Sequence, residues 1–381
     1  MSRLPIDCVL AITYNCNARC TMCDIWKIKN FPELPPEEYL KLPNTLRDVN
    51  ISGGEPFLRK DIADIIANVV KAAPKARMVI STNGFLTDLV AQRMKKILEI
   101  KPDIGVAVSI DGIGEMHDEV RGIPGGFKRD METIQMLKKL GMRNLRLAFT
   151  ITERNVNHFS KVYDLTRELD IQFTHSYAQS SEFYFGGKRN KTNPRRELLD
   201  NEYGYILRRE LGSWDPKRWA RAFFAHGMHS FITSKTPVLS NAPGRDFFYL
   251  DPNGVIYPSV VHNIPMGNIR EVSGGSDLII PATTIDGTRN LTPPYPPHRG
   301  EQRPILPDGM QVPTLTYEEG KYKSFEQFWC SPETEAVRKQ VDASKVPAWM
   351  ICTARTAIKK HPIKVAWWVA RNKMRGTQVP N

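Results

Sequence analysis

The sequence lacks several features that would place it in particular classes of protein. In its 381 residues, no hydrophobic run reaches the roughly 18–20 residues that a membrane-spanning helix needs. The first residues, Met-Ser-Arg-Leu-Pro-Ile-Asp, contain no apolar segment of the kind that secretory signals carry. Only six residues are cysteine, which does not suit the disulfide framework of a small secreted protein. These absences argue against a membrane-spanning protein and a secreted disulfide scaffold, and they predict a cytoplasmic protein.

Acidic residues are scarce relative to basic ones, above all near the C-terminus. Lys and Arg number 53 against 41 Asp and Glu, so the net charge is +12, which predicts anionic partners or substrates. The last acidic residue is Asp342, and the basic residues after it flank the apolar, Trp-rich stretch 363–370. Such a pattern is typical of helices that lie in a membrane interface. It predicts peripheral contact with the inner membrane face; the alternative is a helix docked on the protein with a solvated basic face.

The first half of the chain alternates short apolar runs with amphipathic stretches. This alternation predicts parallel strands joined by right-handed helical crossovers. A further helix is expected in the weakly patterned stretch Pro35–Leu42, and Thr87 and Asn157 are candidate N-caps. The predicted strands are Cys8–Tyr14, Asp48–Ser52, Ala76–Ser81, Ile104–Ile110, Asn144–Thr150 and Ile171–Tyr177, and the predicted helices are Asp61–Ala73, Thr87–Ile100, Phe127–Leu140 and Asn157–Leu169.

We therefore predict an α/β fold, a partial (β/α)6 barrel in residues 1–180. A helical insert in 181–240, rich in aromatic and basic residues, is expected to shape the substrate mouth. Residues 241–345 are expected to form a small α+β extension, and 346–381 a basic amphipathic tail. In the extension we predict the strands Phe247–Leu250 and Val255–Tyr257 around the turn Asp251–Gly254, a proline-rich loop over 271–320, and a helical region at Ser324–Val341.

Three cysteines stand close together directly after the first predicted strand. Cys16, Cys20 and Cys23 lie within eight residues, so one loop can bring three thiolates to a single metal centre. Thiolates select zinc or iron–sulfur clusters. Three ligands instead of four leave a coordination position open for chemistry. The alternative is a structural zinc site that Cys8 or a distant histidine completes.

The spacing CxxxCxxC after the first strand of such a sheet resembles the signature of the radical SAM superfamily. The resemblance implies a [4Fe–4S] cluster on Cys16, Cys20 and Cys23, with S-adenosylmethionine (SAM) on the remaining iron. One electron then cleaves SAM, and the resulting 5′-deoxyadenosyl radical abstracts a substrate hydrogen. Met22 stands where the family commonly has an aromatic residue, and a backbone contact to SAM remains expected there. An oxygen-sensitive enzyme served by a flavodoxin- or ferredoxin-type electron donor is implied.

Further matches to this family follow at successive strand ends. Gly53, Gly54 and Glu55 resemble its GGE motif, which contacts the SAM amino group. Polar residues at the ends of the third and fourth strands would contact the SAM ribose and carboxylate, and an arginine in a following motif would lie near that carboxylate. These residues are Ser81 and Asn83, Ser109 and Asp111, and Arg121.

The second half is similar to the SPASM/Twitch extension of some members of the family, in which cysteines hold auxiliary clusters. Asn241 and Ser259 occupy two positions where cysteine is usual, so we expect a degenerate extension without an auxiliary cluster. The competing interpretation recruits His226, His229 or His262 as extra ligands. The two late cysteines, Cys330 and Cys352, are candidate hydrogen-atom donors; a buried apolar cysteine is the alternative for each.

These features predict a radical SAM enzyme that modifies an anionic sugar, a lipid-linked glycan precursor or a natural-product intermediate. Without an auxiliary cluster to accept an electron, a redox-neutral outcome is expected, such as epimerisation, elimination or rearrangement. The alternatives are modification of a ribosomal peptide or of RNA. Peptide-modifying relatives usually carry an N-terminal recognition domain, for which the strand at Cys8 leaves no room. From another class, a zinc-stabilised nucleic-acid-binding protein would suit the charge, but no RNP-type strand pair is present.

Overall fold

The structure is a computed structural model that describes residues 4–179, 194–240, 242–273, 317–344, 346 and 349–374, without the side chain of Cys352. Most of the predicted proline-rich loop over 271–320 lies outside these residues, as does Asn241. None of the helices in the described ranges combines the length and the apolar character that crossing a bilayer requires.

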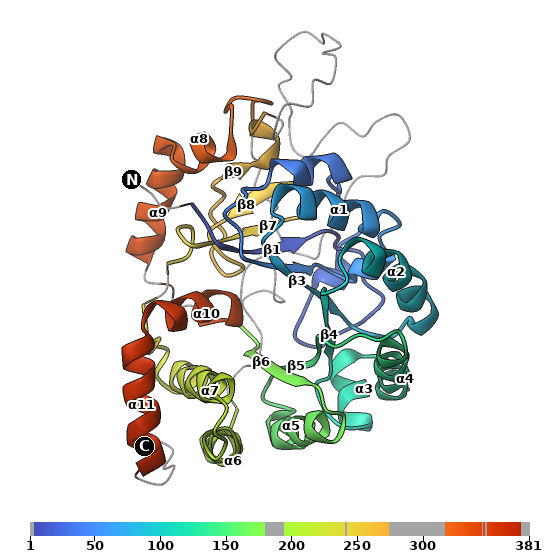
Figure 1. The fold of residues 1–381 in the computed structure, drawn as a ribbon, viewed down its shortest axis with the longest axis vertical. Coiled ribbons are helices and arrows are strands. Elements are labelled where there is room, and N and C mark those ends of the chain that lie inside the picture. The colour runs from blue at the N-terminus through green and yellow to red at the C-terminus, as the bar shows by residue number, and fades with distance from the viewer. Residues whose placement is uncertain are drawn as a thin grey trace.

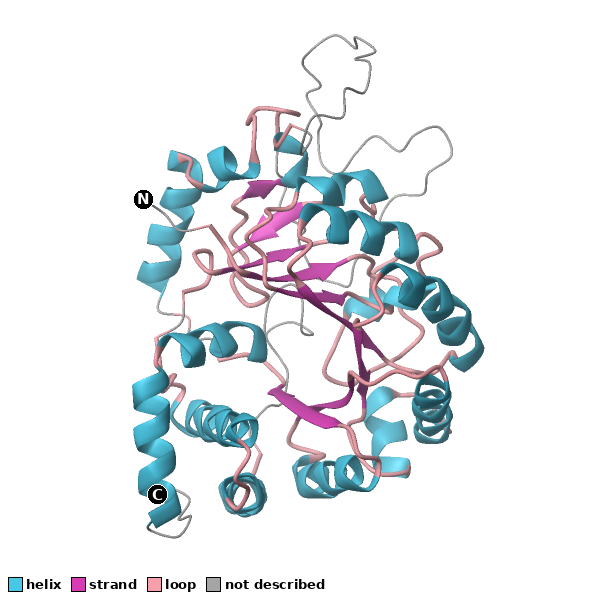
Figure 2. Ribbon diagram, viewed as in Figure 1, coloured by secondary structure: helices cyan, strands magenta, loops and turns pink. Residues whose placement is uncertain are grey.

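A single sheet organises the fold, and its strands curve into an open, partial barrel (Figures 1 and 2). Within the described residues the strand order is β6-β5-β4-β3-β2-β1-β7-β8-β9. The first six strands are parallel, as predicted, and their bounds shift by a few residues at most. They are β1 Asp7–Ala11, β2 Asp48–Ser52, β3 Arg77–Thr82, β4 Gly105–Ser109, β5 Leu145–Ile151 and β6 Gln172–Tyr177.

Helices cover one face of this sheet, and alternation along each strand separates that face from the barrel interior. In β5, Leu145, Leu147 and Phe149 are buried in the large apolar cluster that also contains helix residues, whereas Arg146 and Thr150 face the other side. The helices are α1 Ile62–Ala72, α2 Thr87–Ile100, α3 Glu115–Arg121, α4 Gly126–Lys139 and α5 Phe159–Glu168. The short α3 was not predicted. The stretch expected as a helix at Pro35–Leu42 is the 3-10 helix η2, Pro36–Lys41.

The second half continues the same sheet. Strand β7 (Phe247–Leu250) pairs with β1 in parallel, and β8 (Val255–Tyr257) and β9 (Gly267–Asn268) follow in antiparallel order. The turn between β7 and β8 is the predicted one, with Gly254 at a φ of +91° and the Val255 N–H donating to the Asp251 carboxylate at 2.8 Å. The strands of the expected small extension share hydrogen bonds with the barrel sheet.

Two of the helical regions predicted near the C-terminus are each interrupted by a proline. The predicted helical region at Ser324–Val341 is two helices, and the tail is two more, because Pro332 and Pro362 cannot continue the preceding helix. Helices α6 and α7 lie in the described part of the stretch that was expected as a helical insert. The bounds are α6 Arg196–Leu211, α7 Pro216–Ser234, α8 Phe325–Trp329, α9 Pro332–Ser344, α10 Ile351–Lys360 and α11 Pro362–Met374; the other 3-10 helices are η1 Ile25–Lys27, η3 Pro56–Leu58, η4 Val156–His158 and η5 Ile269–Glu271.

Helix α10 closes the barrel floor, where strands β1 and β2 begin. Asp7 and Asp48 lie side by side there and are almost fully buried. Arg355 of α10 pairs with both, at 2.8 Å and 3.1 Å, and Lys359 pairs with Asp48 at 3.1 Å. Part of the predicted basic amphipathic tail is therefore fixed on the barrel, as the alternative of a docked helix expects.

Candidate active site

The cysteine loop begins five residues after β1 and wraps into a compact turn. The backbone N–H of Ala18 donates to Cys16 Sγ at 3.4 Å, and the N–H of Cys23 donates to the Cys20 carbonyl at 3.3 Å. The three thiols lie close enough together to affect one another's ionisation. Burial raises the pKa of each, that of Cys16 to about 12. They are therefore protonated unless a bound metal provides the compensating charge.

The glycine pair that follows β2 holds this loop against the sheet. The Gly54 N–H donates to the Thr13 carbonyl at 2.7 Å, and the Glu55 N–H donates to the Asn15 carbonyl at 2.8 Å. A Cβ on Gly53 would lie 2.2 Å from the Thr13 oxygen, and one on Gly54 2.3 Å from the Asn15 oxygen. Only glycine permits this approach, which fixes the chain just before Cys16.

Glu55 ties the end of β2 to the end of β3. Its buried carboxylate accepts hydrogen bonds from the Thr82 hydroxyl at 2.9 Å and from the backbone N–H groups of Asn83 and Phe57 at 2.7 Å and 3.2 Å. Burial raises the pKa of Glu55 to about 7, against the lowering effect of these bonds. The sequence predicted a contact between Glu55 and SAM; the structure adds this structural role.

Asn83 and Arg121 reach the cysteines from the segments that follow two different strands, β3 and β4. The Asn83 side-chain amide donates to Asn17 Oδ1 at 2.7 Å and lies 3.9 Å from Cys16 Sγ. Arg121, at the end of α3, donates to Cys20 Sγ at 3.6 Å and pairs with the Asp111 carboxylate at 2.6 Å. Asp111 is fully buried after β4 and also accepts the Thr150 N–H at 2.6 Å.

The end of α3 pairs directly with the cysteine loop. The backbone N–H groups of Arg19 and Thr21 donate to the carbonyls of Arg121 and Val120, both at 2.9 Å. Gly122 has a φ of +65°, and a Cβ there would lie 2.5 Å from the Arg19 carbonyl oxygen. The guanidinium of Arg121 is therefore fixed beside Cys20 by the backbone as well as by Asp111.

The other predicted contact residues lie on the same side of the sheet. Met22 is buried against Val120 and Ala178, and Cys20 packs against this small group. Ser81 donates to Asn50 Oδ1 at 2.9 Å, and Ser109 is half-buried at the end of β4. The structure thus brings the predicted cysteines and contact residues to one edge of the sheet. Their roles toward SAM remain predictions.

Two buried residues behind this site were not singled out from the sequence. His117 Nδ1 accepts the Asp111 backbone N–H at 3.1 Å, so the ring proton lies on Nε2, 3.0 Å from an Asp130 carboxylate oxygen. Both side chains are fully buried. Burial lowers the pKa of His117 to about 3 and raises that of Asp130. His117 belongs to the quoted motif around Arg121, but nothing in the sequence linked it to Asp130, which lies on α4.

The late cysteines and the candidate extra ligands lie elsewhere. Cys330 is exposed at the end of α8, a position that does not favour a donor shielded from water, and the side chain of Cys352 is outside the described residues. Ser259 is buried and bonds to His262 at 2.7 Å. His229 lies 2.5 Å from Asp200, and His226 stacks on Trp368 at 4.8 Å. The three histidines thus contact three different partners.

The donor set suits an iron–sulfur cluster. Three partly buried cysteines on one short loop match the cysteine ligation of such clusters, and an arginine and an amide lie beside two of the sulfurs. Among the described residues, no three His, Cys, Asp or Glu side chains are close enough to share one metal ion, whereas a cluster needs only that each cysteine reach a different iron.

Comparisons with known proteins agree with this site. Residues 10–166 match the model of the radical SAM superfamily. The chain is 28% identical over 284 residues to the sporulation killing factor maturation protein SkfB of Bacillus subtilis (strain 168), across 71% of this chain and 64% of SkfB. It is 34% identical over 167 residues to Fe-coproporphyrin III synthase of Methanosarcina barkeri (strain Fusaro / DSM 804), across 42% of this chain and 40% of that protein. The alignments therefore span less than two thirds of these relatives.

Solved structures show the same fold. SuiB of Streptococcus suis bound to its precursor peptide SuiA superposes with a TM-score of 0.51 at 14% identity, covering 88% of this chain and 67% of SuiB. Histidine-tagged anSMEcpe with bound AdoMet superposes with a TM-score of 0.50 at 18% identity, covering 70% of this chain and 78% of that one. The partial barrel predicted from the sequence is thereby confirmed.

Proposed function

Residues 10–166 match the model of the radical SAM superfamily, and from this premise we propose that the chain is a radical SAM enzyme in which Cys16, Cys20 and Cys23 hold a [4Fe–4S] cluster beside bound SAM. When bound, this pair supplies reductive cleavage of SAM to a 5′-deoxyadenosyl radical that abstracts a hydrogen atom from the substrate. One observation carries the proposal: the cysteine loop, the Gly53–Gly54 turn and Arg121 meet at the edge where the parallel strands end.

Arg121 stabilises the ionised form of the cysteines. Its guanidinium donates to Cys20 Sγ, and the positive charge lowers the pKa of all three thiols against the effect of burial. Asp111 orients the guanidinium, and His117 in turn fixes the backbone at Asp111. The side-chain amide of Asn83 points an N–H group toward Cys16 Sγ, 3.9 Å away, and likewise favours the ionised thiol.

The remaining predicted residues position SAM in this proposal. Gly53 and Gly54 hold the cysteine loop close to the edge of the sheet, and Glu55 holds that turn against β3. The polar side chains of Ser81, Asn83, Ser109 and Asp111 and the backbone at Met22 line the adjacent edge, where ligands of such sheets bind.

The barrel interior favours a polar, anionic substrate. Between β2 and β6 the inner face mixes small apolar residues with small polar residues and two arginines: the apolar ones are Val79, Ala107 and Ala148, the polar ones include Asn50, Ser52, Thr150 and Ser176, and the arginines are Arg77 and Arg146. Burial and the neighbouring cations Arg355 and Arg77 lower the pKa of Arg146 to about 10, as expected of a guanidinium in an excess of positive charge. We propose redox-neutral modification of a sugar, a glycan precursor or a natural-product intermediate. Ser259, bonded to His262 where cysteine is usual, supports the absence of an auxiliary cluster.

Modification of a ribosomal peptide is a second candidate. It is favoured by the similarity to SkfB, a maturation protein, over 71% of this chain, and by the fold shared with SuiB bound to its precursor peptide. The two candidates differ in the substrate that increases turnover of SAM.

The test is formation of 5′-deoxyadenosine by the anaerobically reconstituted protein, with reduced flavodoxin as electron donor. Arg121→Met is compared with Arg129→Met, an exposed arginine on α4. We expect Arg121→Met to lose about 100-fold in rate, the usual effect of a misplaced reacting group, and Arg129→Met to match the wild type. Equal rates in both variants would contradict the proposed role of Arg121. Adding anionic sugars or precursor peptides then shows which substrate class accelerates the reaction.

A further inference from the structure

Helix α11 presents an exposed apolar stripe. Ile363, Trp367 and Met374 are 84%, 61% and 81% exposed, and their spacing of four and seven residues places them on one side of the helix. The opposite side is packed: the Trp368 ring lies 5.4 Å from that of Phe223 on α7. Figure 1 shows α11 along the rim of the molecule, with α7 on its inner side. The stripe is therefore available to a partner.

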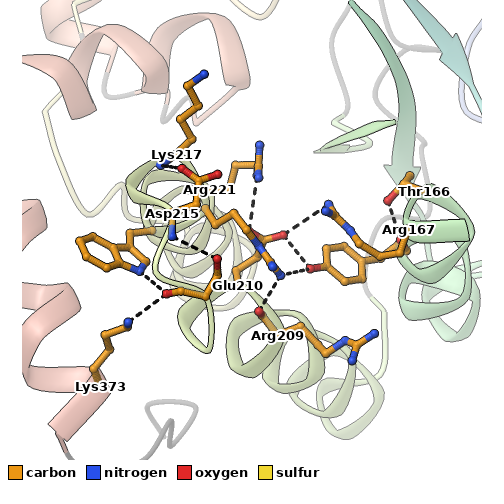
Figure 3. A network of polar contacts seen from close by, with 12 residues as sticks. Thr166, Arg167, Arg209, Glu210, Asp215, Lys217, Arg221 and Lys373 are labelled. Atoms are coloured by element: carbon orange, nitrogen blue, oxygen red, sulfur yellow. Dashed lines mark hydrogen bonds and ion pairs between the residues drawn. The ribbon is translucent and has the colours of Figure 1, made fainter. Parts of the chain in front are cut away.

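The loop between α6 and α7 extends this surface with a fourth large apolar side chain. Trp214 is 83% exposed, and the Lys373 ammonium of α11 lies 4.1 Å from the centre of its ring. Lys373 also donates to the Ser213 carbonyl at 2.9 Å, a contact that Figure 3 shows beside Glu210 and Arg209. The end of α11 and this loop thus form one continuous face.

Two basic hollows border the face. One, of about 440 Å³, is lined by Gly212, Ser213 and four arginines from α5, α6 and α7, which are Arg167, Arg208, Arg209 and Arg218. The other, of about 480 Å³, lies at the start of α11 and is lined by Lys360, Lys364 and the exposed Ile363 and Trp367, together with His361 and Pro362. Both place cations beside the exposed apolar side chains.

The carboxylates near the first hollow leave an excess of positive charge. The buried Glu210 accepts from Arg218 at 3.1 Å and Arg221 at 3.4 Å, and it lies 3.7 Å from Arg167, so one anion serves three arginines (Figure 3). Asp164 lies 3.7 Å from Arg209, and Asp215 caps the N-terminus of α7. Along α11 itself there is no acidic residue.

The basic residues of α10 have a different fate. Arg355 and Lys359 pair with Asp7 and Asp48 on the barrel floor, and Lys360 pairs with Asp246. The C-terminal basic segment is thus divided, with α10 anchoring it to the barrel and α11 carrying exposed charge and apolar surface.

We propose that the α11 face, formed by Ile363, Trp367, Met374, Trp214 and the two basic hollows, docks on an anionic membrane surface. With 13 residues, α11 is about 20 Å long and would lie in the plane of the interface. Its apolar stripe enters the boundary between headgroups and acyl chains, while the lysines and arginines bind lipid phosphates. This docking is independent of the radical chemistry, because none of the face residues belongs to the site around Cys16.

The test is co-sedimentation of the full chain with phosphatidylcholine vesicles, with and without phosphatidylglycerol. We expect binding to the anionic vesicles that weakens as salt rises. Lys364→Gln/Arg371→Gln should lower the partition coefficient roughly 25-fold, about fivefold for each basic residue near such a surface. Ile363→Ser/Trp367→Ser should abolish pelleting. The matched control is Lys95→Gln/Lys96→Gln, which removes two exposed charges from α2, on the far side of the molecule, and should pellet as the wild type does.

Several results would overturn the proposal. Equal pelleting with and without phosphatidylglycerol would refute the electrostatic part, and equal loss in the α2 control would refute the location of the face. If the wild type does not pellet with vesicles but forms dimers, and Ile363→Ser/Trp367→Ser dissociates these dimers, the face joins two copies of the chain. If it ignores vesicles and binds RNA through Lys364 and Arg371, the partner is a nucleic acid.

Discussion

Substitution of Gly54 by alanine tests how the cysteine loop is held. The added Cβ would lie 2.3 Å from the Asn15 carbonyl oxygen, whereas real Cβ atoms essentially never come nearer than 3.0 Å. The two loops must therefore separate by at least 0.7 Å, the difference between these distances. The hydrogen bonds of 2.7 Å and 2.8 Å that join them would lengthen to about 3.5 Å and be lost, at a cost of about 2 kcal/mol in unfolding free energy. Cys16, one residue beyond Asn15, moves with the loop.

A displacement of this size is enough to impair chemistry while the fold survives. We expect Gly54→Ala to form 5′-deoxyadenosine about 100-fold more slowly than the wild type, measured by chromatography. Its unfolding free energy, measured with urea, should fall by only about 2 kcal/mol. The control is Gly212→Ala, because Gly212 has an ordinary φ of −64° and its nearest neighbour to a new Cβ is 3.1 Å away. If Gly54→Ala forms 5′-deoxyadenosine at the wild-type rate, the close contact between these loops does not position the site.

Three further changes have defined outcomes. Burial among aromatic rings lowers the pKa of His175 from an ordinary 6.5 to about 3. Below pH 6.5 the unfolded state therefore binds a proton that the folded state does not, and the folded state loses stability as the pH falls. His175→Phe should therefore keep about 2 kcal/mol that the wild type loses between pH 7 and pH 5, measured by urea unfolding; equal losses would contradict this. Arg355→Met leaves the buried Asp7 without its ion-pair partner and should lower the unfolding free energy by about 3 kcal/mol, whereas an unchanged urea midpoint would mean that α10 does not stabilise the barrel floor. In Glu55→Gln one carboxylate oxygen becomes an NH2 group, which cannot accept a hydrogen bond, so at least one of the three accepted bonds is lost or an amide N–H faces the Asn83 N–H. The midpoint of thermal unfolding should therefore fall. A rise in that midpoint would exclude the assigned hydrogen bonds.

Strand positions and the cysteine loop were predictable because both depend on local patterns. The strand at Asp48–Ser52 and the helix at Thr87–Ile100 were predicted with the bounds that the structure shows. Polar residues after parallel strands must meet at one edge of the sheet, which is why Asn83 and Arg121 could be expected near the cysteines. The proximity of Arg121 to Cys20, 101 residues away, follows from this topology.

Features that depend on contacts between distant segments could not be predicted. The pairing of β7 with β1 requires knowing that the hairpin follows the barrel sheet, and its short strands carry no signal of register. The basic residues of the tail gave no indication that Arg355 would reach Asp7, 348 residues away. The buried contact between His117 and Asp130 could not be predicted either, because nothing in the sequence distinguishes either residue from an ordinary residue of a helix.

The division of the tail has the same origin. The sequence shows one basic segment, and the break at Pro362 could be expected from proline alone. Which half is buried depends on the acidic residues at the barrel floor, because they attract Arg355 and Lys359 and leave α11 exposed. The surface proposed for membrane contact is therefore α11 without α10, and it also includes Trp214, which is far from the tail in sequence.

The most direct test of the account is the iron and sulfide content of the anaerobically reconstituted chain, measured beside the Cys16→Ala/Cys20→Ala/Cys23→Ala variant. We expect about four irons per chain in the wild type and none in the variant, as a single cysteine-bound [4Fe–4S] cluster requires. About four irons surviving in the variant would contradict the absence of an auxiliary cluster. Zinc in place of iron in the wild type would contradict the central claim that these three cysteines hold the cluster of a radical SAM enzyme.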